Sequence, residues 1–431
     1  MKFSMIFEAQ LVDPTPERER QVIHDCVEQA VFAEEMGFDR IWAVEHHSLT
    51  QYAHMSASEI FLTWVAARTR KIRIGHGVVT MPFGYQHPVR VAERAAMLDV
   101  LSGGRVDIGA GRGATRQEMS MYGVRPEDTY PQMEEALRIF SAAWREPEFE
   151  WHGSLDIGPG AILPRPVQDP HPPLFMACSK HDTLKLAAEL GIGALVLGFA
   201  GADDVRTMRK VYDEAIAGRT GERLVSSEIN DHLSALCPTI VLDDAERALR
   251  LGTRGQRFFA ESIAHWYGNA PAPTGWSEDE DAASHAAALA RGRDELVARL
   301  HEANIPARPV DTGTYNAEHA YGSAETAIAY VEQLREIGVD EVMCLIQMGT
   351  VPQEACMETI RQWGEKVIPH FRAPEAREAR EAPEARDAQA ARDAQAARDA
   401  QAARDAQAAR DAQAARAAAR GAAGAAPALE G

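Results

Sequence analysis

The sequence predicts a parallel (β/α)8 barrel, the TIM-barrel fold, with insertions and a low-complexity C-terminal tail. Apolar runs of strand length alternate with amphipathic helical patterns over the first 371 of the 431 residues, and this alternation is typical of a parallel sheet whose strands are joined by helices. The runs number eight, and about 250 residues can form one such barrel. Residues 1–371 are therefore expected to form a single domain, and residues 372–431 the tail.

Each element follows from its local pattern. The strands are expected near residues 2–7, 40–45, 72–79, 106–110, 173–177, 193–198, 234–240 and 341–346. The helices are expected at residues 17–35, 56–69, 88–102, 131–144, 181–190, 202–217, 244–265, 323–337 and 353–371. One extra helix beside a turn at Trp151-His152-Gly153 indicates an insertion between the fourth and fifth strands.

Two segments break the alternation. Residues 268–321 contain Pro and Gly, an acidic run and one helical stretch; a connection of this length indicates a lid over the barrel more than a passive insertion. In the tail, Arg recurs every six residues from Arg386 to Arg416 in an Arg-Asp-Ala-Gln-Ala-Ala repeat. Six residues turn a helix by about 600°, so no apolar stripe forms. We expect a disordered or frayed helical tail, with an assembly tag as the alternative.

Composition excludes several function classes. The net charge is −19 and no basic stripe is visible, which argues against nucleic acid as a partner. No apolar run approaches the roughly 18 to 20 residues of a membrane span, and residues 1–7 read as a first strand and not as a signal peptide. We therefore expect no membrane partner and a cytoplasmic protein.

The five cysteines do not predict a metal or disulfide site. They are odd in number and form no Cys-x-x-Cys pair, so each is expected to be a small buried apolar residue. We expect no metal. Cys178 differs because it follows a strand-like run and so falls at the end of a predicted strand.

The segment Glu45-His46-His47 is the strongest candidate for chemistry. It follows the apolar run 39–44, and because side chains alternate along an extended chain, at most one of the two histidines can face a pocket directly. Histidine titrates near neutral pH and suits proton transfer. Two ordinary surface histidines are the alternative.

Glycines mark the ends of the next two strands. Gly77-Val78 lies in the third strand, and Gly109-Ala110-Gly111-Arg112-Gly113 ends the fourth. Ligands of parallel α/β proteins bind at these carboxyl ends. Residues 109–114 also fit a dinucleotide fingerprint, but no second strand ends in an acidic residue about 20 positions later, as that fold requires. We interpret them as a close backbone approach inside a barrel.

Taken in order, these segments resemble the bacterial luciferase-like, flavin-dependent monooxygenases. The resemblance covers residues 1 to about 371 and rests on residues 42–47, 77–78, 87–90, 101–105, 109–113, 265–267 and 345–352. It implies that reduced FMN and dioxygen form a flavin hydroperoxide that oxygenates a small organic substrate. It also implies a separate NAD(P)H-dependent flavin reductase and a homodimer.

The resemblance assigns roles to single residues. His46 would hydrogen-bond the peroxide or shuttle a proton, with Glu45 and His47 orienting it. Gly77-Val78 would lie against the flavin ring through a non-prolyl cis peptide bond, and Trp266 would stack on the ring. The phosphate would be bound by residues at two strand ends: Arg112, Cys178, Ser179 and Thr183. Arginine suits a phosphate because its fork of donors binds two oxygens, and residues 178–183 precede a helix whose N-terminus can bind an anion.

Two departures from the family pattern, and two alternatives, bear on function. Gly111 replaces the cysteine beside the flavin of the luciferase catalytic subunit and Ala324 replaces a frequent proline, so light emission is not implied. A deazaflavin-dependent hydride-transfer oxidoreductase and a non-catalytic flavin-binding subunit both remain open. Specificity is expected to lie in loops 111–130 and 268–321.

Overall fold

A closed parallel barrel forms the centre of the protein. The computed structural model describes residues 1–197, 201–268, 272–273 and 320–372. Within them the barrel strands are β1 (Lys2–Phe7), β2 (Arg40–Ala43), β3 (Arg73–Thr80), β4 (Val106–Gly111), β7 (Leu174–Cys178), β8 (Gly193–Val196), β9 (Leu233–Val241) and β11 (Glu341–Leu345). Strand β1 pairs with β2 and β11, and β8 pairs with β9, so the eight-stranded cylinder closes and the predicted TIM barrel is confirmed.

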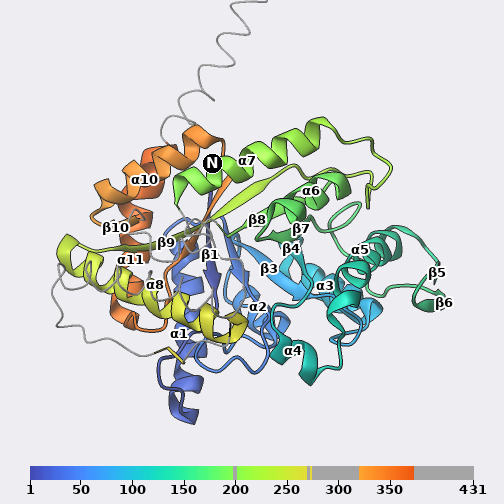
Figure 1. Cartoon of the computed structure of the whole chain (residues 1–431), viewed down its shortest axis with the longest axis horizontal. Helices are drawn as coiled ribbons and strands as arrows, with labels where there is room; N and C mark the ends of the chain where they lie inside the picture. Colours follow the sequence, from blue (N-terminus) through green and yellow to red (C-terminus); the bar gives the residue numbers. More distant parts are fainter. Residues whose placement is uncertain (198–200, 269–271, 274–319, 373–431) are drawn as a thin grey trace, which may run out of the picture. The chain divides into compact units, whose positions relative to one another are not determined.

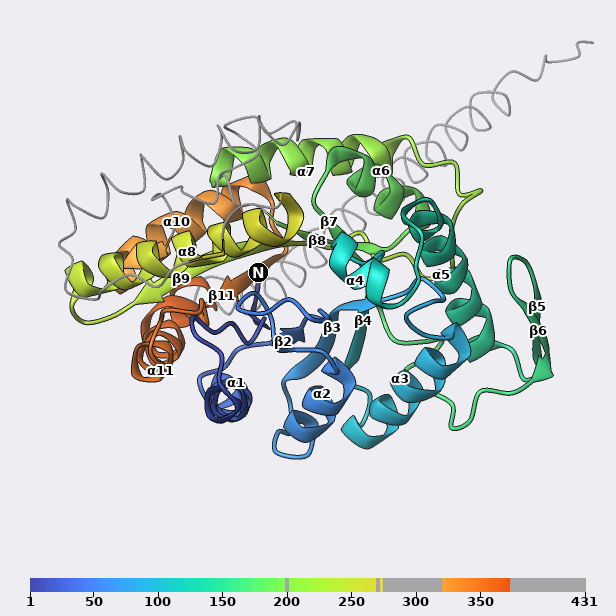
Figure 2. The same cartoon turned by 60° about the horizontal axis from the view of Figure 1, so that its bottom comes forward.

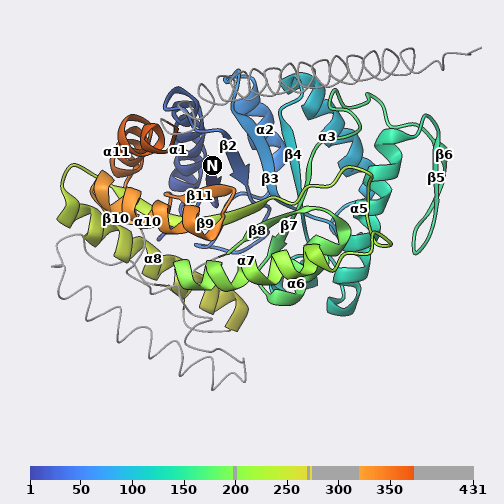
Figure 3. The same ribbon diagram turned by 90° about the horizontal axis from the view of Figure 1, so that it is seen from above.

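Helices surround the strands on all sides (Figures 1 and 3). They are α1 (Pro16–Glu35), α2 (Ser58–Ala66), α3 (Pro88–Ser102), α5 (Thr129–Arg145), α6 (His181–Leu190), α7 (Ala202–Ala217), α8 (Ala245–Gly268), α10 (Ala324–Ile337) and α11 (Gln353–Gln362), the last continuing through a π-helical turn at Trp363–Val367. Helix α3 begins at Pro88, which needs no N–H partner there. All nine predicted helices are observed, with their ends shifted by a few residues.

The insertion predicted between the fourth and fifth barrel strands is observed, but its predicted turn at residues 151–153 is largely a strand. Trp151 and His152 belong to strand β5 (Phe149–His152), which pairs with β6 (Asp156–Gly160) in a hairpin that projects beside α5 (Figure 2). Between the seventh and eighth barrel strands lie the two predicted helices, α8 and α10, and a short strand, β10 (Ala320–Gly322), that pairs with β9. A four-residue strand is too short for its alternating pattern to be separated from a turn in the sequence.

Other elements were not predicted, and some predictions are not tested. A short helix, α4 (Arg116–Met121), and a 3₁₀ turn (Pro126–Asp128) follow β4. The predicted lid at 268–321 and the tail at 372–431 lie almost wholly outside the described residues, so both remain predictions. Within the described part of the chain, no helix is long and apolar enough to cross a bilayer.

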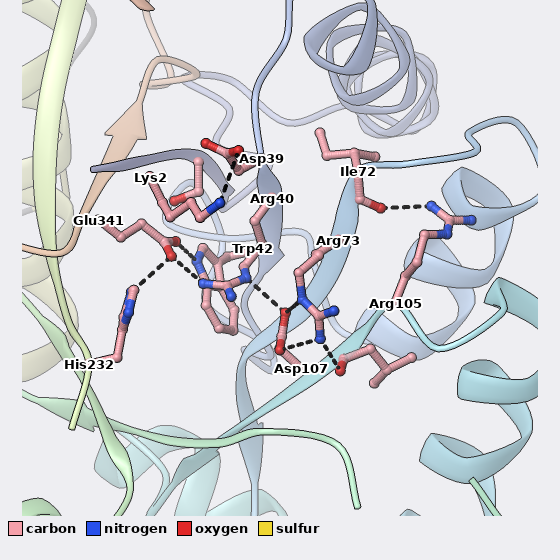
Figure 4. Close-up of polar contacts among 12 residues, drawn as sticks. Lys2, Asp39, Arg40, Trp42, Ile72, Arg73, Arg105, Asp107, His232 and Glu341 are labelled. Atoms are coloured by element: carbon pink, nitrogen blue, oxygen red, sulfur yellow. Dashed lines mark hydrogen bonds and ion pairs between the residues drawn. The ribbon is translucent and has the colours of Figure 1, made fainter. Parts of the chain in front are cut away.

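A buried charge network fills the amino-terminal end of the barrel (Figure 4). Arg40 on β2 is paired with Asp107 on β4, at 2.8 Å, and with Glu341 on β11. Glu341 also accepts hydrogen bonds from Trp42 Nε1 at 2.8 Å and from His232 Nε2 at 3.1 Å. These groups satisfy one another's polar atoms inside the cylinder, so this end is packed and the space for a ligand lies at the carboxyl end.

Candidate active site

A cleft opens at the carboxyl ends of the strands. It encloses about 1000 Å³ of empty space, part of which is open to solvent. Every barrel strand except β11 contributes a lining residue from the strand itself or from the loop after it. Of the predicted site residues, the cleft is lined by Glu45, His46, Gly77, Val78, Arg112, Ser179 and Thr183.

His46 is the histidine that faces this cleft. Its Nδ1 lies 3.0 Å from Oε1 of Glu118 on α4, and because an ionised carboxylate only accepts, Nδ1 carries the hydrogen. The other oxygen of Glu118 accepts from the backbone N–H and the hydroxyl of Thr115, both at 2.9 Å. Glu118 is fully buried, so the ring of His46 is fixed with Nε2 on the opposite side.

The two partners shift each other's proton affinity. Burial lowers the pKa of His46, but the hydrogen bond to Glu118 and the charge of Glu8 outweigh it, and the pKa is raised. Burial raises the pKa of Glu118, while the contacts with His46 outweigh that effect and the pKa is lowered. The arrangement therefore favours an imidazolium facing a carboxylate near neutral pH.

A second carboxyl group lies on the other side of the ring. Oε2 of Glu8, just after β1, is 4.0 Å from Nε2 of His46. Glu8 is 6% exposed and lines the cleft, and this Oε2 has no hydrogen-bond partner among the described residues. Burial raises the pKa of Glu8 to about 7, with Glu118 adding to the rise and His46 opposing it. Glu8 was not predicted.

Glu45 and His47 are bound to each other, and only Glu45 lines the cleft. His47 Nε2 lies 3.0 Å from Oε1 of Glu45, and its Nδ1 is 3.1 Å from the hydroxyl of Tyr122. Glu45 in turn accepts from Thr80 Oγ1 at 2.5 Å and from Gln86. His47 does not line the cleft, which confirms the expectation that at most one of the paired histidines faces a pocket.

The backbone at Gly77 and Val78 forms one wall of the cleft. The Gly77–Val78 peptide bond is cis, as the resemblance implied. Val78 packs where β4 has glycines: a Cβ added at Gly111 would lie 2.2 Å from Val78 Cγ2, and one at Gly109 would lie 2.9 Å from Val78 Cγ1. The glycines of the sequence motif thus make the close backbone approach that we expected, and the space that a cysteine would need at position 111 belongs to Val78.

Arg112 lines the same cleft as the polar residues at the start of α6. Its guanidinium carbon is 5.1 Å from the ring centroid of Tyr130, and within the described residues it forms no ion pair. Ser179 and Thr183, at the start of α6, line the cleft as well. Cys178 is fully buried and its Sγ lies 3.5 Å from the carbonyl oxygen of Thr183; burial raises its thiol pKa to about 12, so it is a neutral packing residue.

The aromatic side of the cleft differs from the prediction. Trp266 does not line the cleft and donates from Nε1 to the carbonyl oxygen of Thr50 at 3.0 Å. Its neighbour Tyr267 lines the cleft instead, with Phe259 and Tyr52. The ring of Tyr52 meets that of His46 edge-on, with centroids 5.1 Å apart.

The comparison with protein families identifies the group to which this fold and cleft correspond. A family model described as luciferase-like monooxygenase matches residues 1–341. This chain belongs to the luciferase-like monooxygenase family. It is a flavin-dependent oxidoreductase of the monooxygenase type, and several of its relatives are described as monooxygenases.

Three similar proteins illustrate the range of the family. The oxygenase component of a flavin-dependent trigonelline monooxygenase from Acinetobacter baylyi is 24% identical over 86% of this chain and 96% of its own length. The oxygenating constituent of 3,6-diketocamphane monooxygenase from Pseudomonas putida, solved with FMN, has a TM-score of 0.64 at 18% identity, covering 86% of this chain and 98% of that one. A coenzyme F420-dependent tetrahydromethanopterin reductase from Methanopyrus kandleri has a TM-score of 0.59 at 20% identity, covering 86% and 99%.

Proposed function

We propose that this luciferase-like monooxygenase binds reduced FMN in the cleft and uses dioxygen to oxygenate a small organic substrate. The observation that carries the proposal is the position of His46. Its ring is fixed by the buried Glu118 and faces a cleft whose other wall is the cis Gly77–Val78 peptide. A proton-bearing imidazole and a flat backbone wall are thus held in one cleft, next to a cation.

The phosphate end of the cofactor would be bound by Arg112, Ser179 and Thr183. The fit rests on the guanidinium of Arg112, which has no carboxylate partner among the described residues, and on the start of α6, where backbone N–H groups favour an anion. Cys178 would support this loop from below through its contact with Thr183.

The ring end would lie against Gly77 and Val78. The glycines at positions 109 and 111 leave the volume that Val78 occupies, so this wall is shaped by backbone and one aliphatic side chain. Tyr267 lines the cleft and is better placed than Trp266 to cover a flat ring.

The chemistry divides between cofactor and protein. When bound and reduced, FMN supplies the two electrons with which dioxygen is cleaved to give an oxygenated product and water. Glu118 accepts from Nδ1 of His46 and stabilises the imidazolium, in which Nε2 also carries a proton that it can donate at the cleft. Glu45 and His47 fix the backbone of the loop that carries His46, and Tyr52 and Phe259 shield the ring from water.

We propose two partners for this protein. The trigonelline enzyme is described as an oxygenase component, which supports a separate NAD(P)H-dependent flavin reductase as the source of reduced FMN here. We also propose a homodimer. Ile60 and Trp64 on α2, and Met97 and Leu101 on α3, are 68%, 52%, 47% and 64% exposed. Each pair is spaced four residues apart and so lies on one helix face, and an apolar face of this kind is suited to a second copy.

Mixing anaerobically reduced FMN, with and without protein, against oxygenated buffer in a stopped flow tests the function. We expect flavin bound to the protein to reoxidise through at least one absorbance phase that free flavin lacks, and we expect His46→Ala to change the rate of that phase. Reoxidation identical to that of free flavin, together with protein-dependent hydride transfer from reduced F420 to an added organic acceptor, would indicate the deazaflavin-dependent activity instead. If the protein changed the reaction of neither flavin nor F420, it would be a non-catalytic subunit.

A further inference from the structure

The cleft contains a buried acid that the proposed chemistry does not use. Glu8 lines the cleft and is only 6% exposed, and its buried Oε2 has no hydrogen-bond partner among the described residues. A buried polar atom left unpaired costs roughly 1–3 kcal/mol, so a protein rarely keeps one unless a ligand or water pairs with it.

The neighbours of Glu8 determine its protonation. Burial opposes a negative charge on Glu8, His46 favours it and Glu118 opposes it. His46 is already paired with Glu118 at 3.0 Å, closer than the 4.0 Å that separates it from Glu8. The raised pKa of Glu8, about 7, agrees with this geometry. Near and below neutral pH, Glu8 therefore presents an O–H group to the cleft, which donates where a carboxylate could only accept.

The surroundings of Glu8 are aromatic. Tyr52 packs against His46 on one side and lies 5.8 Å from the ring of Phe259 on the other. Tyr267 lines the same cleft, as do Ile6 and Leu236. A ligand at this place would meet apolar surface on most sides and one polar group at Glu8.

From these contacts we propose that Glu8 is a substrate-binding residue. Its protonated carboxyl group donates a hydrogen bond to an uncharged acceptor on the substrate, such as a carbonyl, amide or ether oxygen. The apolar remainder of the substrate packs against Tyr52, Phe259 and Tyr267. This inference rests on the proposed function for the location of the reacting centre, because the hydrogen bond would hold the substrate beside Nε2 of His46, 4.0 Å from Glu8.

Four ligands of similar size test the chemistry of this site. They are cyclohexyl methyl ketone as an uncharged acceptor, 1-cyclohexylethylamine as a cation, cyclohexanecarboxylate as an anion, and ethylcyclohexane without a polar group. Their dissociation constants would be measured by ligand-observed NMR at pH 6.5, with the protein free and saturated with oxidised FMN. The ketone is expected to bind most tightly. Tightest binding of the amine or of the carboxylate would overturn the proposal.

Two variants distinguish the role of Glu8 as a hydrogen-bond donor from its role in filling space. Glu8→Gln keeps a donor of the same shape and is expected to bind the ketone within about threefold of the wild type, whereas Glu8→Leu is expected to weaken ketone binding about tenfold, the effect of one hydrogen bond. Glu17→Gln changes an exposed glutamate in the same way and should change nothing. Equal ketone affinity in the wild type and Glu8→Leu would refute the role of Glu8.

The pH dependence gives a second readout. Because only protonated Glu8 donates, ketone affinity of the wild type should fall as the pH rises through about 7, and that of Glu8→Gln should stay constant. The same dependence in both proteins would contradict the proposal. FMN affinity, measured separately by flavin fluorescence, should be unchanged in both variants. If FMN does not bind even to the wild type, the proposed function fails, while the titrations of the flavin-free protein still decide the role of Glu8.

Discussion

Nδ1 of His46 lies 3.0 Å from Oε1 of Glu118, a residue 72 positions later in the chain. The contact joins the loop after β2 to the short helix α4 after β4, and both carboxylate oxygens of Glu118 are occupied by donors on these segments. The orientation of the one histidine in the cleft therefore depends on a buried charge supplied by another barrel segment.

Replacing Glu118 by Gln should lower the pKa of His46, because the carboxylate that stabilises the imidazolium is removed while the shape is kept. A step that needs protonated His46 runs at its full rate below the pKa of His46 and slows as the pH rises through that pKa. The falling limb of the kcat/KM profile should therefore move to lower pH in the variant. At neutral pH we expect a loss of roughly tenfold or more, as for other acid–base groups. NMR titration of His46 measures the shift directly.

The exposed Glu127→Gln substitution, in the 3₁₀ turn after α4, is the matched control and should leave the profile unchanged. An unaltered His46 titration in Glu118→Gln would show that the carboxylate does not set the charge of the ring.

Adding a side chain at Gly111 should disturb the wall of the cleft. A Cβ there would lie 2.2 Å from Val78 Cγ2, so Gly111→Ala should displace Val78, lower stability by about 1–3 kcal/mol and weaken FMN binding. Val78→Ala in the same chain should restore much of both losses, because it removes the clashing atom. Thermal unfolding and FMN titration measure the two effects.

Gly158→Ala serves as the control for Gly111→Ala, since nothing lies within 4 Å of a Cβ at that position. If Val78→Ala gave no rescue, the two residues would not share the space that the structure assigns to them.

Removing the positive charge of Arg112 should weaken the binding of FMN but not that of riboflavin, which has no phosphate. Charge-assisted hydrogen bonds contribute roughly 1.5–3 kcal/mol, so Arg112→Gln should weaken FMN binding about 10- to 100-fold and leave riboflavin binding almost unchanged. Arg116→Gln, an exposed arginine four residues later, is expected to bind both as the wild type does. Equal weakening for both flavins would place the phosphate elsewhere.

A charge in the apolar face of α2 should break the proposed homodimer. Trp64 is 52% exposed beside Ile60, and Trp64→Glu places a carboxylate where two copies would meet. Analytical ultracentrifugation should show a dimer for the wild type and a monomer for the variant. A wild-type monomer would refute the homodimer.

The network at the other end of the barrel should make stability depend on pH. Arg40 and His232 outweigh burial and hold the pKa of Glu341 well below its usual value, so this carboxylate stabilises the fold above pH 4.5 and loses that contribution as the pH falls towards the folded-state pKa. Glu341→Gln should lower the free energy of unfolding at pH 7 by about 3 kcal/mol, because it breaks a buried ion pair.

Urea unfolding between pH 7 and pH 3 should show a smaller loss of stability in Glu341→Gln than in the wild type. The exposed Glu336→Gln is the control and should follow the wild type. Identical pH dependence in Glu341→Gln and the wild type would contradict the role of the network.

The sequence predicted what depends on local pattern. Strand and helix periodicity gave the barrel, and strand ends gave His46, Gly77 and Arg112, because parallel strands bring their carboxyl ends to one rim. Glu8 was not predicted, because it is a single glutamate after an apolar run. Its position beside His46 arises only when β1 pairs with β2 in the folded barrel. The aromatic wall was assigned to Trp266 instead of Tyr267, because the two are adjacent and the sequence does not fix the rotation of α8.

Glu118 belongs to a local sequence pattern that indicates the start of a helix. Thr115 and Glu118 form a capping box, a Thr-x-x-Glu pattern that marks the start of a helix. The helix is only six residues long, which is too short for an apolar helical periodicity to be recognised in the sequence. The pairing of Glu118 with His46 could not be predicted, because it joins residues 72 positions apart.

The most direct test of the account is an equilibrium titration of the protein with FMN, oxidised and then dithionite-reduced, followed by flavin fluorescence and absorbance, with F420 as the comparison. We predict one saturable site per chain that binds reduced FMN more tightly than F420 and is weakened by Arg112→Gln. The absence of saturable FMN binding in either redox state, or a clear preference for F420, would contradict the claim that the carboxyl end of this barrel is an FMN site.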